Sequence, residues 1–302
     1  MRLLRVGPAG QERPAAIDAQ GVLRDLSSIT ADIDGELLAS PSRLVAVRKA
    51  VADGTLPVLP AGQRVGAPVA RPGKVVGIGL NYTDHAAETG VAIPDSPVVF
   101  LKASTSVTGP FDDVVLPPGS VATDHEVELG VVVGARLSHC FDPDDALAAV
   151  GGYVTANDVT ERDLVAQGPT WAKGKCADTF TPIGPWLVTA DEVGDPRALS
   201  LHLSVNGSAR QSGSTSLMAY GVGELLAYVS RLMTLEPGDL VLTGTPGGVA
   251  AGRPEPKPYL RDGDVVEAEV SGLGRQRTPV ANLSMTLAHW RGQAHDEIMW
   301  HD

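Results

Sequence analysis

From residue 74 onward the chain is a series of short β-rich runs separated by turn-forming residues, and this pattern constrains its fold more than any other feature. Each run is bounded by Gly, Pro, Asp or Asn, as strand ends require; examples are KVVGIGL, PVVFLK, WLVT, LHLSVNG and DLVLTG. Two predicted helices, at about 144–150 and at 218–232, interrupt the series. Strands and helices do not alternate regularly, so the pattern predicts an α+β, predominantly β domain with a mixed sheet instead of a βαβ array.

The first 70 residues predict a smaller unit. They contain a strand-like LLRV, a short apolar segment near 21–26 and a helical stretch near 41–53. The segment LPVLPAGQRVGAPVARPG, which follows, is rich in Pro and Gly and predicts a connection. We therefore expect a small α+β domain at 1–70, a β-rich domain at 71–282 and a C-terminal tail at 283–302.

Composition limits the partners. The chain carries 24 Lys and Arg against 36 Asp and Glu, a formal charge of −12, which repels nucleic acid and anionic membrane surfaces. Its two cysteines, Cys140 and Cys176, form no C-x-x-C, so neither a disulfide framework nor a thiolate zinc site is indicated. No apolar stretch approaches membrane-spanning length. We expect a cytoplasmic protein that acts on a small molecule, with no nucleic-acid or membrane partner.

Carboxylates gather in the segment TDHEVELGVVVG. Asp124, Glu126 and Glu128 alternate with other residues, so a strand here would place all three on one face. Three anions on one face repel one another unless a cation lies among them. A solvated edge face is the alternative, but the valines that follow indicate burial on both faces. Asp158, which ends the strand-like GGYVTAND, supplies a further ligand.

Oxygen ligands from Glu126, Glu128 and Asp158 select a hard cation, Mg²⁺ or Mn²⁺ before Ca²⁺. A zincin site, a dinucleotide site and a serine hydrolase site are excluded because their motifs are incomplete or absent. HEVEL begins like a zincin motif, but Leu129 stands where the second histidine is required. The G-x-G at residues 77–79 lacks the third glycine of a dinucleotide site, and there is no G-x-S-x-G of a serine hydrolase.

His85 and Glu88 are the candidate acid and base. They lie three residues apart in GLNYTDHAAETG, and Gly90 predicts the end of the helix that would carry them. On one helical turn the two side chains meet, and a carboxylate beside an imidazole raises its basicity, as a base that activates water requires. The alternative is an ordinary surface pair.

Two further segments are candidates for binding an anionic substrate. Lys173 and Lys175 lie among Gly, Pro and aromatic residues, where one lysine could hold a substrate carboxylate or stabilise an enolate. The alternative is a pair of solvated loop lysines. LTGTPGGV is typical of a turn that presents backbone N–H groups and the hydroxyls of Thr243 and Thr245 to an anion.

Taken in order, eight segments within residues 72–282 resemble the fumarylacetoacetate hydrolase family. They are GLNYTDHAAE, PVVFLKAST, DHEVELGVVVG, NDVTERDL, KGKCADTFTPIGPW, VNGSARQSGST, LEPGDLVLTGTPGGV and GDVVEAEVSGLG. The resemblance implies a mixed β-sandwich roll, Mg²⁺ or Mn²⁺ on the three carboxylates, a His85/Glu88 dyad on a mobile lid, and a homodimer. It also implies that Lys175 is catalytic and that the substrate is contacted by Tyr82, Arg162, Lys175 and Thr245.

The resemblance implies a reaction as well. The N-terminal MRLLRVGPAGQERPAAID and the KGKCADTFTPIGPWLVT segment are most similar to the branch that hydrolyses 2,4-diketo-3-deoxy sugar acids, such as rhamnonate or fuconate derivatives. We expect cleavage of a C–C bond in such an acylpyruvate-type acid to give pyruvate and a second acid. Isomerisation of carboxymethyl-hydroxymuconate, decarboxylation of oxaloacetate, or a catalytically silent metal-binding role are the alternatives. Many family members carry glutamine where this chain has Val165, so one substrate hydrogen bond is expected to be missing or supplied elsewhere.

Overall fold

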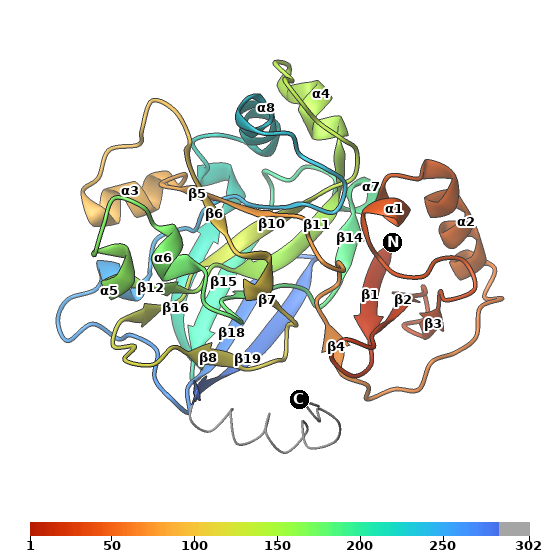
Figure 1. Ribbon diagram of the computed structural model, residues 1–302, viewed down its shortest axis with the longest axis horizontal. Coiled ribbons are helices and arrows are strands. Elements are labelled where there is room, and N and C mark those ends of the chain that lie inside the picture. Colours follow the sequence, from red (N-terminus) through yellow and green to blue (C-terminus); the bar gives the residue numbers. More distant parts are fainter. Residues whose placement is uncertain (284–302) are drawn as a thin grey trace, which may run out of the picture.

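The computed structural model describes residues 1–283, which fold into two packed β-sheets with helices around them (Figure 1). The larger sheet has ten strands. In spatial order they are β3 (Leu23–Asp25), β2 (Arg13–Ile17), β1 (Arg2–Val6), β14 (Leu187–Thr189), β11 (Val150–Asn157), β10 (Val127–Val133), β17 (Leu240–Leu242), β5 (Val75–Gly79) and β6 (Val98–Lys102), with β4 (Val65–Gly66) paired to β1.

The smaller sheet has five strands. Its order is β16 (Ser208–Ser214), β15 (Ser200–Val205), β18 (Val265–Val270), β19 (Gly274–Asn282) and β8 (Val114–Leu116). Two short pairs complete the strands: β9 (Thr123–Asp124) with β12 (Thr160–Glu161), and β7 (Val107–Thr108) with β13 (Thr181–Pro182). Both sheets combine parallel and antiparallel pairs, and strand residues outnumber helical ones, so the predicted α+β, predominantly β fold is confirmed.

The helices are short. They are α1 (Gly35–Leu38), α2 (Pro41–Ala52), α3 (Thr83–Thr89), α4 (Pro143–Ala148), α5 (Arg162–Val165), α6 (Ala172–Lys175), α7 (Ala190–Val193) and α8 (Val222–Leu232). The predicted helix at 218–232 began too early: the Gly221 N–H is capped by the Glu224 carboxylate at 2.6 Å, which starts α8 at the next residue. The end of the predicted helix at 144–150 belongs instead to β11.

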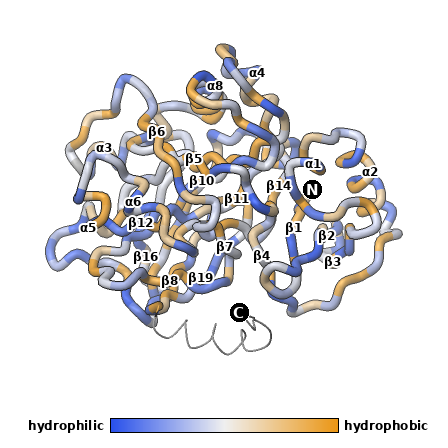
Figure 2. Tube along the Cα trace, viewed as in Figure 1, coloured by the Kyte–Doolittle hydropathy of each residue, from blue (hydrophilic) through white to orange (hydrophobic). Residues whose placement is uncertain are grey.

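Strand β10 divides the interior into two cores. Val127, Leu129 and Val131 lie in the core that the larger sheet shares with the smaller one. Val132 faces the opposite way, into a second core that includes the helices α1 and α2. Because side chains alternate along a strand, Glu128 lies on the same face as Val132. Five of the seven residues of β10 are Val or Leu, as a strand buried on both faces requires. Figure 2 colours each residue of the chain by hydropathy.

The N-terminal strands continue the larger sheet. β1 pairs with β14, with Arg2 opposite Val188 and Leu3 opposite Leu187, so this small N-terminal region is joined to the rest by main-chain hydrogen bonds. The division into domains at 1–70 and 71–282 stays a prediction. The predicted tail lies, from residue 284, outside the described residues. No helix within residues 1–283 is long and apolar enough to cross a membrane.

Candidate active site

Strand register brings the three carboxylates together. β10 and β11 are antiparallel with Val127 opposite Asn157, which places Glu126 opposite Asp158, and the Asp158 N–H donates to the Glu126 carbonyl at 2.8 Å. Glu128 lies two residues further along the same face. One oxygen from each of the three carboxylates lies within 4.8 Å of the others, and all three side chains are buried. The structure thus brings together the three carboxylates that the sequence analysis proposed as metal ligands.

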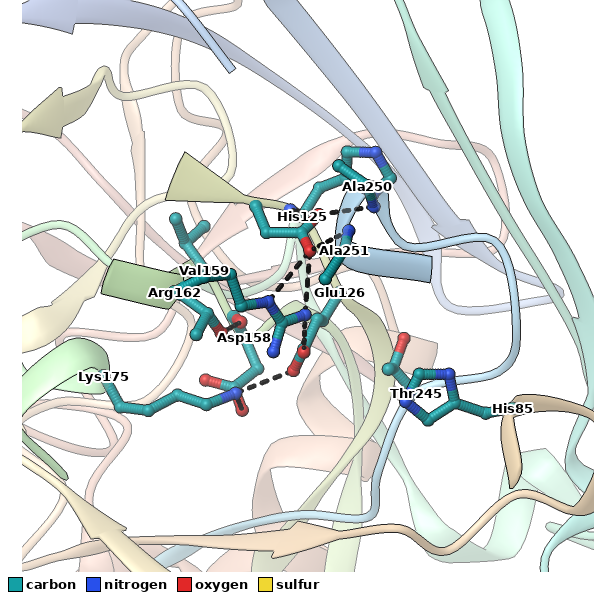
Figure 3. Close-up of polar contacts among 12 residues, drawn as sticks. His85, His125, Glu126, Asp158, Val159, Arg162, Lys175, Thr245, Ala250 and Ala251 are labelled. Carbon is teal, nitrogen blue, oxygen red and sulfur yellow. Dashed lines mark hydrogen bonds and ion pairs between the residues drawn. The ribbon is translucent and has the colours of Figure 1, made fainter. Parts of the chain in front are cut away.

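Two cationic side chains hold this group. Lys175, from α6, donates to Glu126 at 2.7 Å and to Asp158 at 2.5 Å. Arg162, the first residue of α5, donates from its Nη2 to Glu126 at 2.5 Å and from its Nε to Asp124 at 2.9 Å. In Figure 3 Lys175 reaches the carboxylates from one side and Arg162 lies above them. Asp124 accepts from this arginine and does not join the three ligands.

A third cation, Lys102, was not anticipated from the sequence. It ends β6, is 3% exposed, and its Nζ donates to Asp158 at 2.5 Å and to the carbonyls of Val159 and Phe180. Burial lowers the pKa of this lysine, although Asp158 opposes the shift. A lysine that closes an apolar strand run is the only local signal in the sequence, and it names no partner. Lys102 therefore fixes the carboxylate of Asp158 and is not among the residues that line the cavity described below.

Charge is distributed unevenly among the three acids. Burial raises the pKa of Glu126, but Lys175 and Arg162 outweigh that effect and hold it at about 2. Burial raises the pKa of Glu128 well above its usual range, and the negative charges of Asp158 and Glu126 raise it further. The partner of Glu128 is the backbone N–H of Gly244 at 2.7 Å. Among residues 1–283 no basic side chain forms an ion pair with Glu128, so a bound cation would supply the positive charge that the ionised carboxylate lacks.

The predicted dyad lies on α3. Gly90 ends this helix in the left-handed conformation, with φ of 69°, as predicted. The Nδ1 of His85 lies 3.6 Å from the Oε2 of Glu88, and that oxygen also accepts from the Gly248 N–H at 2.8 Å. The segment 244–248 also carries Thr245, which lies beside His85 in Figure 3. His85 and Thr245 line the cavity into which the three carboxylates open. The predicted mobility of this helix as a lid stays a prediction.

The carboxylates open into a cavity of about 180 Å³. Its polar lining consists of the three acids with His85, Arg162, Lys175 and Thr245, and its apolar lining consists of Ile78, Gly79, Leu80, Phe100, Val165 and Trp171. Lys173 is exposed and bonds Gln167, so Lys175 is the lysine of its segment that faces the cavity. Thr243 is buried and donates to the Leu129 carbonyl.

Tyr82 is placed differently from the other predicted site residues. It is fully buried in the core between the sheets and is not among the residues that line the cavity. Burial raises its pKa well above the usual value for a tyrosine. Its predicted contact with substrate stays a prediction.

Gln211, in β16, supports the site and was missed in the sequence. Its Oε1 accepts from the Val127 N–H at 3.0 Å, and its Nε2 donates to the Thr245 hydroxyl at 2.8 Å and to the Pro246 carbonyl. The Thr245 hydroxyl in turn donates to the Val127 carbonyl at 2.9 Å. Gln211 is 2% exposed, so it joins the carboxylate strand to the Thr245 turn from within the protein.

This geometry agrees with a family match. Residues 74–281 match the model described as the C-terminal domain of fumarylacetoacetate (FAA) hydrolase. The chain belongs to the fumarylacetoacetate hydrolase family. A protein of Burkholderia multivorans, named only as a presumed hydrolase, is 50% identical over 279 residues, which is 91% of this chain and 97% of that protein.

Solved structures of the family share the fold. A fumarylacetoacetate hydrolase from Exiguobacterium antarcticum is 35% identical with a TM-score of 0.82, over 93% of this chain and 99% of that one. A 5-carboxymethyl-2-hydroxymuconate delta-isomerase from Mycobacterium smegmatis is 32% identical with a TM-score of 0.74, over the same shares. A maleylpyruvate hydrolase from Sphingobium, in complex with manganese(II) and pyruvate, is 28% identical with a TM-score of 0.77, again over 93% and 99%.

Proposed function

We propose that this chain is a divalent-metal-dependent hydrolase that cleaves a C–C bond in a 2,4-diketo acid of the acylpyruvate type, releasing pyruvate and a second acid. One observation carries the proposal: the buried carboxylates of Glu126, Glu128 and Asp158 converge in a cavity that His85 also lines. The manganese and pyruvate bound to the related maleylpyruvate hydrolase support both the metal and the product.

The residues present fit a hard cation. Three carboxylates are the donors that Mg²⁺ and Mn²⁺ prefer. A carboxylate offers several lone pairs, so Glu126 and Asp158 can accept from Lys175 and still ligate a metal. Glu128 has a backbone N–H as its partner and is the acid that a cation would neutralise. When bound, Mg²⁺ or Mn²⁺ would polarise the 2-keto group and stabilise negative charge on a leaving enolate.

The remaining steps fall to side chains. Glu88, held by the Gly248 N–H, orients His85, which takes a proton from a water molecule in the cavity. The water oxygen attacks C4, the C3–C4 bond breaks, and its electron pair goes to C3 as the enolate of pyruvate. Protonation at C3 then gives pyruvate, and C4 becomes the carboxyl group of the second acid.

Lys175 is placed to balance the enolate charge. Burial lowers the pKa of this lysine, but Asp158 and Glu126 outweigh that effect and raise it, so Lys175 stays an ammonium in the site. A fixed positive charge in a buried cavity stabilises developing negative charge more than it would in water. Arg162, held between Asp124 and Glu126, keeps the carboxylate group in place.

The test replaces the proposed base. In His85→Ala, turnover of acetylpyruvate falls by about 10²- to 10⁴-fold because no side chain accepts the proton of water, while Mg²⁺ affinity is unchanged. His202→Ala, which removes an exposed histidine of β15, is the matched control and keeps full turnover. The products are identified by mass. Undiminished turnover in His85→Ala would rule out this histidine as the base.

A second candidate, isomerisation, is favoured by the similarity to the Mycobacterium smegmatis delta-isomerase. Both reactions form an enolate, but isomerisation uses no water and leaves the mass unchanged. A hydroxymuconate product of unchanged mass would move the chain to the isomerase branch, and carbon dioxide from oxaloacetate with no second acid would move it to the decarboxylase branch. Mg²⁺ binding with no turnover of any keto acid would instead identify a metal-binding protein without catalysis.

Three finer assignments are proposals. A 2,4-diketo-3-deoxy sugar acid as the substrate and a homodimer as the assembly rest on the resemblance alone, and the cytoplasm as the location rests on composition. Light scattering on the purified protein tests the dimer, since a mass of one chain would exclude it. The sugar-acid substrate is tested together with the apolar lining of the cavity.

A further inference from the structure

Two glycines of β5 make room for two aromatic rings. A Cβ on Gly77 would lie 2.2 Å from the Phe100 ring, and a Cβ on Gly79 would lie 2.1 Å from the Trp171 ring. Gly77 is directly opposite Phe100 in the pairing of β5 with β6. The two rings lie 5.5 Å apart at a tilt of 56°, an arrangement in which aromatic rings attract. Any side chain at either glycine would displace a ring, so the strand is built to hold both.

The rings extend one side of the active-site cavity. Phe100 and Trp171 line it together with Leu80 and Val165, and these four residues are called the apolar wall below. The wall directly adjoins the charged end, since the Nζ of Lys175 lies 5.0 Å from the centre of the Phe100 ring. A substrate whose keto-acid head lies at the carboxylates therefore extends its other end along the wall.

Among the side chains of the wall, only the indole N–H of Trp171 can form a hydrogen bond with that end of the substrate. The two lining cations are already engaged: Arg162 with Asp124 and Glu126, and Lys175 with Glu126 and Asp158. A hydroxyl buried without a partner loses its hydrogen bonds to water, whereas a hydrocarbon group gains by leaving water. A wall with a single donor leaves most hydroxyls of a polyhydroxylated substituent without a partner, so it favours the less hydroxylated of two chains of equal length.

We propose that the apolar wall binds the acyl substituent of the substrate, and that the chain selects 2,4-diketo acids with a hydrocarbon or aromatic substituent over polyhydroxylated ones. This rests on the proposed function and names the substrate class of the same site. It departs from the sugar-acid substrate that the sequence resemblance favours. Val165 adds a further apolar side chain to the wall.

The test compares two unreactive ligands with the same carbon chain. 2-Oxohexanoate and 4,5,6-trihydroxy-2-oxohexanoate share the keto-acid head and differ only in three hydroxyls. Calorimetry on the Mg²⁺-loaded protein is expected to give 2-oxohexanoate a Kd lower by about tenfold or more, the effect of leaving roughly one buried hydroxyl unpaired. Equal affinities, or tighter binding of the hydroxylated acid, would overturn the proposal.

Variants locate the preference in the wall. Trp171→Ala is expected to reduce the affinity ratio by about fivefold or more, because water then reaches the substituent, and Trp171→Phe to restore most of it. Leu101→Ala removes a neighbouring side chain that is 45% exposed and does not line the cavity, so it should leave both affinities unchanged. Melting temperatures verify that each variant folds. An unchanged ratio in a folded Trp171→Ala would show that the wall does not select the substituent.

Acetylpyruvate separates this inference from the proposed function. Its methyl substituent is too small to depend strongly on the wall, so its cleavage tests the hydrolase alone. Cleavage of acetylpyruvate with no preference for 2-oxohexanoate would overturn the inference and leave the hydrolase standing. If acetylpyruvate is not cleaved and neither oxo acid binds, both fail.

Discussion

Two groups of acidic and basic side chains in this protein differ in how they are balanced. In the N-terminal region Arg5 bonds Asp32 at 2.6 Å and Glu12 at 3.4 Å, and Arg64 bonds Glu12 at 2.8 Å and Asp112 at 2.5 Å. Every carboxylate of this group therefore has a guanidinium partner. The group ties the first strands to the segment that follows β7, which is a structural role.

The active-site group has more basic partners but is less complete. Asp158 is bonded by two lysines, and Glu126 by Lys175 and Arg162, yet within residues 1–283 the partner of Glu128 is a backbone N–H and no basic side chain. Breaking a closed ion-pair network costs stability, whereas a buried carboxylate left over from such a network is costly until a cation binds it. The active-site group is therefore distinguished from the structural one by an acid that lacks a basic partner, and not by its number of ion pairs.

The largest effect on stability is expected at Gln211, which supports the active-site group. Gln211→Met removes the hydrogen bonds to Val127 and Thr245, so the free energy of unfolding falls by about 1–3 kcal/mol. Turnover falls as well, by about 10- to 100-fold, because small displacements of catalytic groups are costly.

Gln276→Met is the matched control for this variant. Gln276 is equally buried but donates to the carbonyls of Thr155 and Pro182, away from the cavity. It should show a similar loss of stability by chemical denaturation with turnover unchanged. Equal turnover in both glutamine variants would show that Gln211 has no more than a structural role.

A smaller effect on stability is expected in the N-terminal ion-pair network. Glu12→Gln weakens the contacts with Arg5 and Arg64, which are partly buried, and should lower the free energy of unfolding by about 1–2 kcal/mol. Turnover and Mg²⁺ affinity should not change, because no residue of this network lines the cavity. A loss of Mg²⁺ affinity in this variant would break the distinction between the two groups.

The smallest effect is expected at an exposed ion pair between α2 and α7. The hydrogen bond from Arg48 holds the pKa of Asp191 below its usual range, so the native state binds the proton less readily than the unfolded one. The pair therefore stabilises above the unfolded pKa of about 3.9, and this contribution is lost as pH falls through the lower native pKa. Both side chains are about half exposed, so Asp191→Asn should lower stability by less than about 1 kcal/mol at pH 7. Melting temperatures at pH 7 and pH 3 measure this; a difference that did not shrink between pH 7 and pH 3 would contradict it.

The sequence predicted that the three carboxylates lie together because the evidence for this is local. Glu126 directly precedes β10 and Glu128 lies within it, and Asp158 directly follows β11, which pairs with β10. Lys102 and Gln211 were not predicted, because their partners are 56 and 84 residues away and their own segments carry no sign of the pairing. Such contacts depend on the register of distant strands, which periodicity does not determine.

Two elements show the same limit in the fold. Met218 extended the predicted helix because it is apolar, yet it is buried from a non-helical segment before α8. β19 was not predicted because Gln276 occupies a buried position, which breaks the apolar alternation expected of a half-buried strand. In each case tertiary packing determined the structure where the local pattern indicated otherwise.

The central claim is that Glu128 completes a metal site. Calorimetric titration of Mg²⁺ or Mn²⁺ into the wild-type protein and into Glu128→Gln tests it most directly, with Glu12→Gln as the control. We expect one cation to bind per chain in the wild type and in the control, and the affinity to fall at least about a hundredfold in a folded Glu128→Gln. Equal binding by all three proteins, or no binding by the wild type, would contradict the account.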